Sequence, residues 1–505
     1  MRLRRLLVLL ATVPLVLGGV GAAGRATAAP GCGALTAVHV PQGRVTSAAT
    51  GTDDGFCRVE GVLDPAVHFT VDLPVSGWSG DYLQLGCSGL CGTVPNFAFP
   101  NAGVLCEAVR DKTLVLAGDD SGHTGDNAGA QPATWGADPR ARVEWGRTSE
   151  HRLRRASDAL ITAYYGHGPA HRYFDGCSTG GRQALNLAQR YPADFDGILA
   201  GAPAGNEAPL VLLQAWLAVH NTDRHGDQVL GPDKLPALHA AVVRACGEIV
   251  QDPRRCGFQP SSLRCPPGTD HPTCLTPAQV AAVVAFYRGP DGLYNGGMPY
   301  GSELGWIDQF VVRSGSPPGG AGEIAYQYLR YLGYPTVLPA GFRLTDVRFS
   351  RATFDRLNLV GDALYNANDP DLSAFRAHGG RLILWHGWAD ASIPPFSTID
   401  YYRAVQRRGG ADAFTRLYLI PAGYHCLFGP ADADGNPSEI GVPDLLTPLI
   451  DWVESGTAPG TVDVPTVDAD RNPIRYLEVA PFDALAPVRA APGSLNAGYH
   501  YVGRY

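Results

Sequence analysis

Residues 171 to 190, HRYFDGCSTGGRQALNLAQR, constrain the fold of this chain more than any other stretch. A short run typical of a β-strand leads into Ser178, which has a glycine two residues away on each side, and a run with helical periodicity follows. This pattern is typical of a sharp strand-to-helix turn that exposes a nucleophilic serine at the end of a sheet. The alternative interpretation is a serine in an ordinary turn or in a helix cap.

Other short aliphatic runs end in turns in the same way and alternate with helical stretches. They are DYLQL (81–85), TLVLAG (113–118), RLILWHG (381–387) and TRLYLIP (415–421). Strands that alternate with helices predict an α/β fold with a mostly parallel sheet.

The pattern changes between about residues 205 and 367. This stretch contains four cysteines, a proline- and glycine-rich run (SGSPPGGAGE, 314–323) and many aromatic residues. We interpret residues 206–366 as a large inserted lid domain. The α/β core is then made of two parts, residues 29–205 and 367–505.

The first 28 residues have the layout of a secretory signal peptide. Arg2, Arg4 and Arg5 precede an apolar run, Leu6 to Val20, and Ala26-Thr27-Ala28 is a small-residue cleavage signal. An uncleaved membrane anchor is the alternative, but the apolar run is shorter than the ~18 residues that indicate a membrane span. We therefore expect a secreted, extracellular protein that is not held in a membrane.

Charge and cysteine content narrow the classes of function. The formal charge of the whole chain is −8, and because the leader holds four arginines and no acidic residue, the remainder carries −12. An acidic chain without basic tracts is a poor candidate for binding nucleic acid or anionic membranes. Eleven cysteines in an exported chain predict disulfides, with one cysteine left over.

Two further residues complete a candidate catalytic triad with Ser178. Asp390 follows the strand-like run LILW, and His425 follows LYLI, so both are expected on loops at the carboxyl ends of strands. The order serine, acid, histidine is the one that this type of elbow requires. His425 would accept the proton of the Ser178 hydroxyl, and Asp390 would hold the imidazole and stabilise its charged form. Taken singly, the aspartate could be a helix cap and the histidine a surface residue.

Two backbone N–H groups are the candidates for an oxyanion hole. The N–H of Thr179 follows the nucleophile directly and is one of them by the geometry of the elbow. The second is expected from the loop LGCSGLCG (85–92), with Gly89 as the donor and Ser88 beside it. The alternative for this loop is a plain tight turn.

Cys177 directly precedes Ser178, and Cys426 directly follows His425. If Ser178 and His425 share a hydrogen bond, their neighbours are close enough for the Cα separation of about 4.4–6.8 Å that a disulfide requires. We therefore predict a Cys177–Cys426 disulfide across the triad. The alternative is two small buried thiols that fill space.

Five stretches together resemble the tannase/feruloyl esterase family of secreted α/β hydrolases. The stretches are DDSGH (119–123), GCSTGGRQALNLAQRYPADFDGILAGAPAGN (176–206), PDLSAFRAHGGRLILWHGWADASIPP (370–395), YHC (424–426) and WVESGTAP (452–459). The resemblance extends from about residue 32 to 460 and so covers nearly the whole mature chain. The resemblance implies an α/β-hydrolase fold with an inserted lid, and Ser178, Asp390 and His425 as its triad.

The same resemblance implies disulfide pairings and a metal site. The implied pairs are Cys177–Cys426, Cys32–Cys57, Cys246–Cys256 and Cys265–Cys274; Cys87, Cys91 and Cys106 are left, with no indication of which two pair. Relatives carry an aspartate-rich calcium loop in the lid, but CGEIVQDPRRC (246–256) is too short and too poor in acids to supply six or more oxygens. We expect no metal and no cofactor. Another candidate, DADGNPSE (432–439), has carboxylates at alternating positions but lacks the matching terminal acid, and its alternative interpretation is a solvated surface turn.

Two other departures concern cysteines. No cysteine follows Cys426, although relatives have a C-terminal pair. Cys87 and Ser88 stand where relatives favour glycines, next to the expected donor Gly89.

The chain is therefore predicted to be a serine esterase that hydrolyses small-molecule esters of aromatic (phenolic) acids, such as galloyl or feruloyl esters, through an acyl-enzyme. The alternatives are a broad-specificity esterase or peptidase with the same triad, and a catalytically silent binding protein with the same fold. Four aromatic residues of the lid could stack on an aromatic acyl group, or could belong to its core: Trp306, Phe310, Tyr326 and Tyr331. The sequence does not indicate an oligomeric state.

Overall fold

The computed structural model describes residues 31–51, 55–97, 103–125, 132–313, 320–427, 440–468 and 472–496. The expected signal peptide, 1–28, lies outside these ranges.

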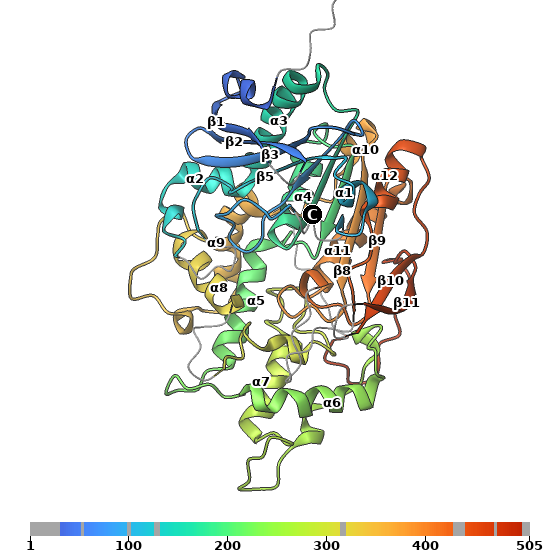
Figure 1. Cartoon of the computed structure of the whole chain (residues 1–505). Coiled ribbons are helices and arrows are strands. Elements are labelled where there is room, and N and C mark those ends of the chain that lie inside the picture. The colour runs from blue at the N-terminus through green and yellow to red at the C-terminus, as the bar shows by residue number, and fades with distance from the viewer. Residues whose placement is uncertain are drawn as a thin grey trace, which may run out of the picture.

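Nine strands of the described chain form one sheet, in the order β1-β2-β3-β5-β4-β6-β7-β8-β9 (Figure 1). Their bounds are β1 (Gly43–Thr50), β2 (Phe56–Leu63), β3 (Val67–Pro74), β4 (Asp81–Leu85), β5 (Val115–Asp119), β6 (His171–Cys177), β7 (Gly197–Gly201), β8 (Arg381–Gly387) and β9 (Thr415–Ile420). The first three strands are antiparallel, and β3 pairs with β5 in the antiparallel sense. The other six strands, β4 to β9, are mutually parallel. The predicted α/β fold with a mostly parallel sheet is confirmed.

A separate hairpin, β10 (Val462–Val467) with β11 (Pro473–Val479), follows the main sheet. The α-helices of the described chain are α1 (Glu107–Arg110), α2 (Pro139–Val143), α3 (Ser149–Tyr165), α4 (Thr179–Arg190), α5 (Glu207–His220), α6 (Leu235–Cys246), α7 (Pro277–Arg288), α8 (Gly320–Tyr331), α9 (Arg351–Val360), α10 (Ser373–His378), α11 (Phe396–Arg407) and α12 (Leu446–Ser455).

Short helical turns connect these elements. Most are 3-10 turns, while η4 and η10 are single turns of π-helix: η1 (Cys32–Ala37), η3 (Thr134–Ala137), η4 (Glu144–Thr148), η5 (Pro232–Lys234), η6 (Pro253–Arg255), η7 (Pro260–Leu263), η8 (Glu303–Trp306), η9 (Leu344–Asp346), η10 (Gly361–Tyr365), η11 (Ala411–Ala413) and η12 (His425–Leu427).

Each face of the parallel part of the sheet has its own apolar core, because successive side chains of a strand point to opposite faces. In β7, Ile198 packs in the core that α3, α4 and α11 cover, whereas Leu199 packs in the core that α12 covers. In β8, Leu382 and Ile383 divide between the two cores in the same way. The strands read as continuous apolar runs because both faces are buried.

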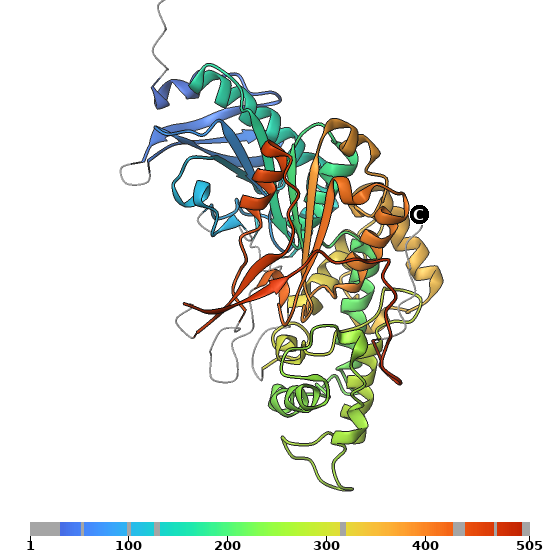
Figure 2. The ribbon, with the colours of Figure 1, turned by 90° about the vertical axis from the view of Figure 1, so that its right-hand side faces the viewer.

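The chain leaves the sheet after β7 and returns at β8. Helices α5 to α9 lie between these two strands in the sequence and contribute most of two further apolar cores, which also include residues of the loops after β4 and β8. Figures 1 and 2 both place α5, α6 and α7, in green to yellow, in the lower part of the molecule and β1 to β3 in the upper part. The change of pattern that the sequence indicates between 205 and 367 thus corresponds to a helical segment beside the sheet.

All eleven cysteines lie within the described ranges. The structure contains the Cys32–Cys57, Cys177–Cys426, Cys246–Cys256 and Cys265–Cys274 disulfides, which are the pairs that the sequence predicts. It also pairs Cys87 with Cys91 and leaves Cys106 as a buried free cysteine. This number of disulfides fits an oxidising compartment.

No helix within the described ranges is both long enough and apolar enough to cross a lipid bilayer.

Candidate active site

The register of the sheet brings four loops to one edge. Cys177, the last residue of β6, pairs with Gly201 at the end of β7, and Gly201 pairs with Trp385 of β8. Gly387, at the end of β8, pairs with Ile420 at the end of β9. Because these strands are parallel, the loops that follow β4, β6, β8 and β9 leave from the same edge. This is the edge at which open α/β sheets place their sites.

Ser178 lies in the sharp turn between β6 and α4. Its φ of 65° and ψ of −120° are a backbone conformation that side-chain-bearing residues rarely adopt. The turn is possible because its two flanking glycines allow close packing: a Cβ at Gly176 would lie 2.6 Å from the Gly180 backbone, and a Cβ at Gly180 would lie 2.9 Å from the Cys87 carbonyl oxygen. The local pattern thus produces the expected elbow.

Asp390 and His425 are in direct contact. The Nδ1 atom of His425 lies 2.7 Å from the Oδ2 atom of Asp390, whose side chain is fully buried. The other carboxylate oxygen, Oδ1, accepts hydrogen bonds from the backbone N–H groups of Ser392 (2.9 Å) and Ile393 (2.8 Å). The carboxylate is therefore held in one orientation, and it favours the imidazole tautomer with its proton on Nδ1.

A second histidine, His386, also contacts Asp390. Its Nε2 atom lies 3.2 Å from Asp390 Oδ2 and 2.7 Å from the carbonyl oxygen of Ile393, while its Nδ1 contacts the Thr398 hydroxyl. Burial alone would raise the pKa of the Asp390 carboxyl, but the charges and hydrogen bonds of His425 and His386 hold it well below its usual value. Asp390 therefore stays ionised over the whole physiological pH range.

A disulfide joins the residue before Ser178 to the residue after His425. Cys177 and Cys426 are joined with a Cα–Cα distance of 5.9 Å. Within the described ranges, the Ser178 hydroxyl and the Nε2 atom of His425 make no hydrogen bond to another residue. In many enzymes this last hydrogen bond of a triad closes only when substrate binds.

The two expected oxyanion donors lie side by side. The Thr179 hydroxyl donates a hydrogen bond of 2.5 Å to the carbonyl oxygen of Gly89, which ties the start of α4 to the loop after β4. Gly89 has a positive φ of 55°. Among the described residues, no acceptor takes the backbone N–H of Gly89 or of Thr179.

In loop 246–256, the acid Asp252 has a charged partner. The two oxygens of the Asp252 carboxylate each lie 2.8 Å from a nitrogen of the Arg254 guanidinium, so this acid is already paired with a cation. The alternative calcium turn, 432–439, lies outside the described residues.

One other group of described side chains has the spacing of metal ligands. Ligand atoms of Asp81, His171 and Glu454 lie within 4.8 Å of one another. Asp81 and His171 are the first residues of β4 and β6, so this group lies at the amino ends of the strands, opposite Ser178. It cannot take part in chemistry at the serine.

The four aromatic residues of the helical segment divide into two kinds. Trp306, Phe310 and Tyr331 are buried in its apolar cores, as the alternative interpretation holds. Tyr326 is partly exposed and stacks on Phe342 at 5.9 Å, and it lines a cavity of about 670 Å³ together with Phe342 and Phe310. This cavity reaches the end of α5, at Ala218, whereas Ser178 contacts Ala204, which precedes that helix.

Two residues that bear on the site were missed by the sequence analysis. His386 is the last residue but one of β8, four residues before Asp390, and this position was the only signal for it. Gln183, five residues after Ser178 on α4, is buried under the Gly89 loop and had no signal beyond the helical pattern.

A serine at a strand–helix elbow, with an aspartate–histidine pair at the same edge of a mostly parallel sheet, defines the class of α/β hydrolases. The comparisons with known proteins agree. Residues 47–490 match the family described as "Tannase and feruloyl esterase". An uncharacterized esterase of Xanthomonas campestris pv. campestris is 32% identical, with 86% of this chain and 84% of that protein covered.

Mono(2-hydroxyethyl) terephthalate hydrolase of Piscinibacter sakaiensis is 27% identical, with 85% of this chain and 82% of that protein covered. The crystal structure of feruloyl esterase B from Aspergillus oryzae superposes with a TM-score of 0.76 at 24% identity, over 89% of this chain and 95% of that one. The chain belongs to the tannase and feruloyl esterase family. It is a carboxylic ester hydrolase.

Proposed function

We propose that this chain is a secreted serine esterase that hydrolyses esters of aromatic (phenolic) acids through an acyl-enzyme. One observation supports the serine mechanism: the Cys177–Cys426 disulfide joins the residue before Ser178 to the residue after His425, and the Nδ1 atom of His425 contacts the buried Asp390. This is the relation between nucleophile, base and orienting acid that acyl transfer requires.

The proposed reaction has two halves. His425 Nε2 removes the proton of the Ser178 hydroxyl as the oxygen attacks the ester carbonyl, and the N–H groups of Gly89 and Thr179 bind the resulting oxyanion. Collapse of this intermediate breaks the ester bond, and the imidazolium gives its proton to the departing alcohol. Water then attacks the acyl-enzyme in the same way, and the acid and the free Ser178 hydroxyl are released. No metal and no cofactor takes part.

The proposed substrate class rests on the similarity of this chain to named esterases. Relatives that share most of their length with this chain are named feruloyl esterases and a terephthalate ester hydrolase, and all these acyl groups are aromatic. We propose that residues 206–366 act as the lid over the acyl group. Secretion is supported by the signal-like residues 1–28 and by the disulfides.

Covalent labelling and a substrate panel test the proposal together. Wild-type protein is treated with a fluorophosphonate probe and assayed on feruloyl, galloyl, terephthaloyl and short aliphatic esters and on the matching amides. We expect one label per chain on Ser178, faster cleavage of aromatic esters than of the amides, and loss of both activities in Ser178→Ala. A wild-type protein that neither reacts with the probe nor cleaves any ester would refute the proposal, and preferred cleavage of amides would point to a peptidase.

A further inference from the structure

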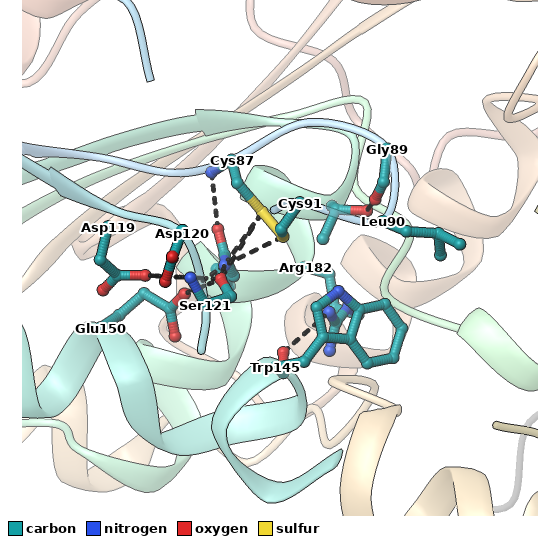
Figure 3. The surroundings of a disulfide bond; sticks show 12 residues. Cys87, Gly89, Leu90, Cys91, Asp119, Asp120, Ser121, Trp145, Glu150 and Arg182 are labelled. Carbon is teal, nitrogen blue, oxygen red and sulfur yellow. Dashed lines mark hydrogen bonds between the residues drawn. A yellow bond between two sulfur atoms is a disulfide. The ribbon is translucent and has the colours of Figure 1, made fainter. Parts of the chain in front are cut away.

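The Cys87–Cys91 disulfide closes a five-residue loop that has Gly89 at its centre (Figure 3). Both cysteines are buried, at 4% and 1% exposure. The sequence analysis left their pairing open, and the reaction described above makes no use of it. The bridge lies beside a proposed oxyanion donor, the backbone N–H of Gly89.

The bridge acts on the Gly89 N–H through one peptide plane. The backbone N–H of Cys91 donates a hydrogen bond of 2.8 Å to the carbonyl oxygen of Ser88. In a trans peptide the C=O and the following N–H point in opposite directions, so holding the Ser88 carbonyl also fixes the direction of the Gly89 N–H. The disulfide fixes Cys91 relative to Cys87 and thereby keeps this plane in place.

Gln183 supports the same loop from below. Its Oε1 atom accepts the Cys87 N–H at 3.0 Å, and its Nε2 atom lies 3.3 Å from Cys87 Sγ. The same Nε2 donates to the Ser121 hydroxyl at 3.2 Å and to the Glu150 carboxylate. Because a flipped amide would set two donors against each other at Cys87, this network fixes the orientation of the side chain. In Figure 3, Ser121 and Glu150 lie below the disulfide, beside the dashed hydrogen bonds.

The loop is also held on its far side. His123 Nε2 contacts the Leu90 carbonyl oxygen at 2.8 Å, and the Thr179 hydroxyl holds the Gly89 carbonyl oxygen. Burial lowers the pKa of His123 to about 4, so its ring stays neutral and its Nε2–H donates to Leu90. The carbonyl groups of residues 88, 89 and 90 are therefore all occupied, while the Gly89 N–H remains available for an oxyanion.

We propose that the Cys87–Cys91 disulfide and Gln183 are positioning groups that aim the Gly89 N–H at the oxyanion of the transition state. The inference rests on the proposed serine mechanism. Neither group touches the substrate; each acts on the loop. Because an oxyanion donor acts on charge that develops only in the transition state, a displaced loop lowers kcat while it leaves substrate binding nearly unchanged.

The first experiment removes the bridge and compares it with a matched bridge elsewhere. Cys87→Ala with Cys91→Ala is set against Cys265→Ala with Cys274→Ala, which removes another short-range disulfide from the helical segment. Measured quantities are kcat and KM on an aromatic ester, the melting temperature, and the affinity for an arylboronic acid and for the free product acid. The boronic acid forms a tetrahedral adduct with the serine, whereas the product acid does not.

We expect the Cys87/Cys91 variant to lose about 10- to 100-fold in kcat, less than the about 10²- to 10³-fold loss of a whole donor. KM and product affinity should change less than threefold, and boronic acid affinity should fall in parallel with kcat. The Cys265/Cys274 variant should keep kcat within about twofold. Equal kcat losses in both variants, or an unchanged kcat in the first, would overturn the inference.

A second set of variants covers the case in which the cysteine variant does not fold. Gln183→Met keeps the size of the side chain but removes its hydrogen bonds, and we expect about a tenfold loss of kcat. The exchange Gln183→Glu with Glu150→Gln keeps an acceptor for the Cys87 N–H. It also keeps one donor and one acceptor facing each other at positions 183 and 150, so kcat should return to within about threefold of wild type. A Gln183→Met variant that loses only melting temperature would show a purely structural role and refute the proposal. A wild-type enzyme without ester hydrolysis and without boronate binding would instead refute the serine mechanism.

Discussion

Cys177 and Cys426 form a disulfide with 5.9 Å between their Cα atoms, and it joins the residue before Ser178 to the residue after His425. The two cysteines are 249 positions apart in the sequence. The bridge spans two loops that leave the same sheet edge after β6 and β9, with β7 and β8 between these strands. The distance between the proposed nucleophile and its base therefore does not depend on two independent loops.

Removal of this bridge should affect turnover more than folding. In Cys177→Ala with Cys426→Ala we expect kcat to fall about a hundredfold, because displacements near 1 Å at a reacting centre have effects of this size. The chain-entropy model gives an upper figure of about 5 kcal/mol for the lost stability. Steady-state kinetics and circular dichroism check the two effects. A variant that keeps kcat within threefold, or free thiols at both positions in active wild-type enzyme, would contradict the prediction.

The Thr179 hydroxyl should contribute to catalysis through Gly89. Thr179→Val has nearly the same shape but cannot donate to the Gly89 carbonyl oxygen, so we expect kcat to fall about three- to tenfold, in line with the net value of one hydrogen bond. KM should stay within twofold. Thr179→Ser keeps the hydroxyl and serves as the control. Equal losses in the valine and serine variants would assign the effect to packing instead.

Glu207 should make stability depend on pH. Burial raises the pKa of its carboxyl to about 7, against the opposing effect of Arg182. The folded state therefore keeps a proton that the unfolded state loses, and stability falls as pH rises from about 4.5 to 7. Replacement by glutamine removes this dependence, so the gain of Glu207→Gln over wild type should be larger at pH 8 than at pH 5, by about 2 to 3 kcal/mol.

Urea denaturation of both proteins at the two pH values measures this difference. The comparison between wild type and variant cancels the contributions of other groups to the pH dependence. His123 is one such group: its pKa is lowered in the folded protein, so its contribution to stability is lost as pH falls, whereas that of Glu207 is lost as pH rises. The same gain at both pH values would show that Glu207 is ionised in the folded protein.

Chelation should leave the enzyme unchanged. Asp252 is paired with Arg254 and the loop from 246 to 256 offers no calcium cage, so we expect equal activity and equal melting temperature with and without EDTA. Differential scanning fluorimetry and an ester assay check this. A fall of several degrees that added calcium reverses would place a structural cation in the protein.

The sequence by itself determined the parts of this protein that depend on local pattern. The elbow at Ser178 and the positions of Asp390 and His425 after strands follow from apolar runs and turn residues. Strands and helices each have a fixed period, because their backbone hydrogen bonding is regular. The spacing of apolar residues in a short stretch therefore indicates which of the two it forms. The confirmed α/β fold has the same origin. The link between Cys177 and Cys426 could be inferred because each stands next to a residue that the chemistry requires to be close to the other.

The tertiary structure alone decided contacts between segments that no periodicity relates. The pairing of Cys87 with Cys91 rather than Cys106 was open, because all three are small, buried side chains in the same region of the chain. Gln183 reaches the Cys87 backbone across 96 positions, and His386 reaches Asp390 only because the loop after β8 folds back on its own strand. Such contacts depend on the distances between packed elements, and those distances are set by the whole core and not by any short stretch of sequence.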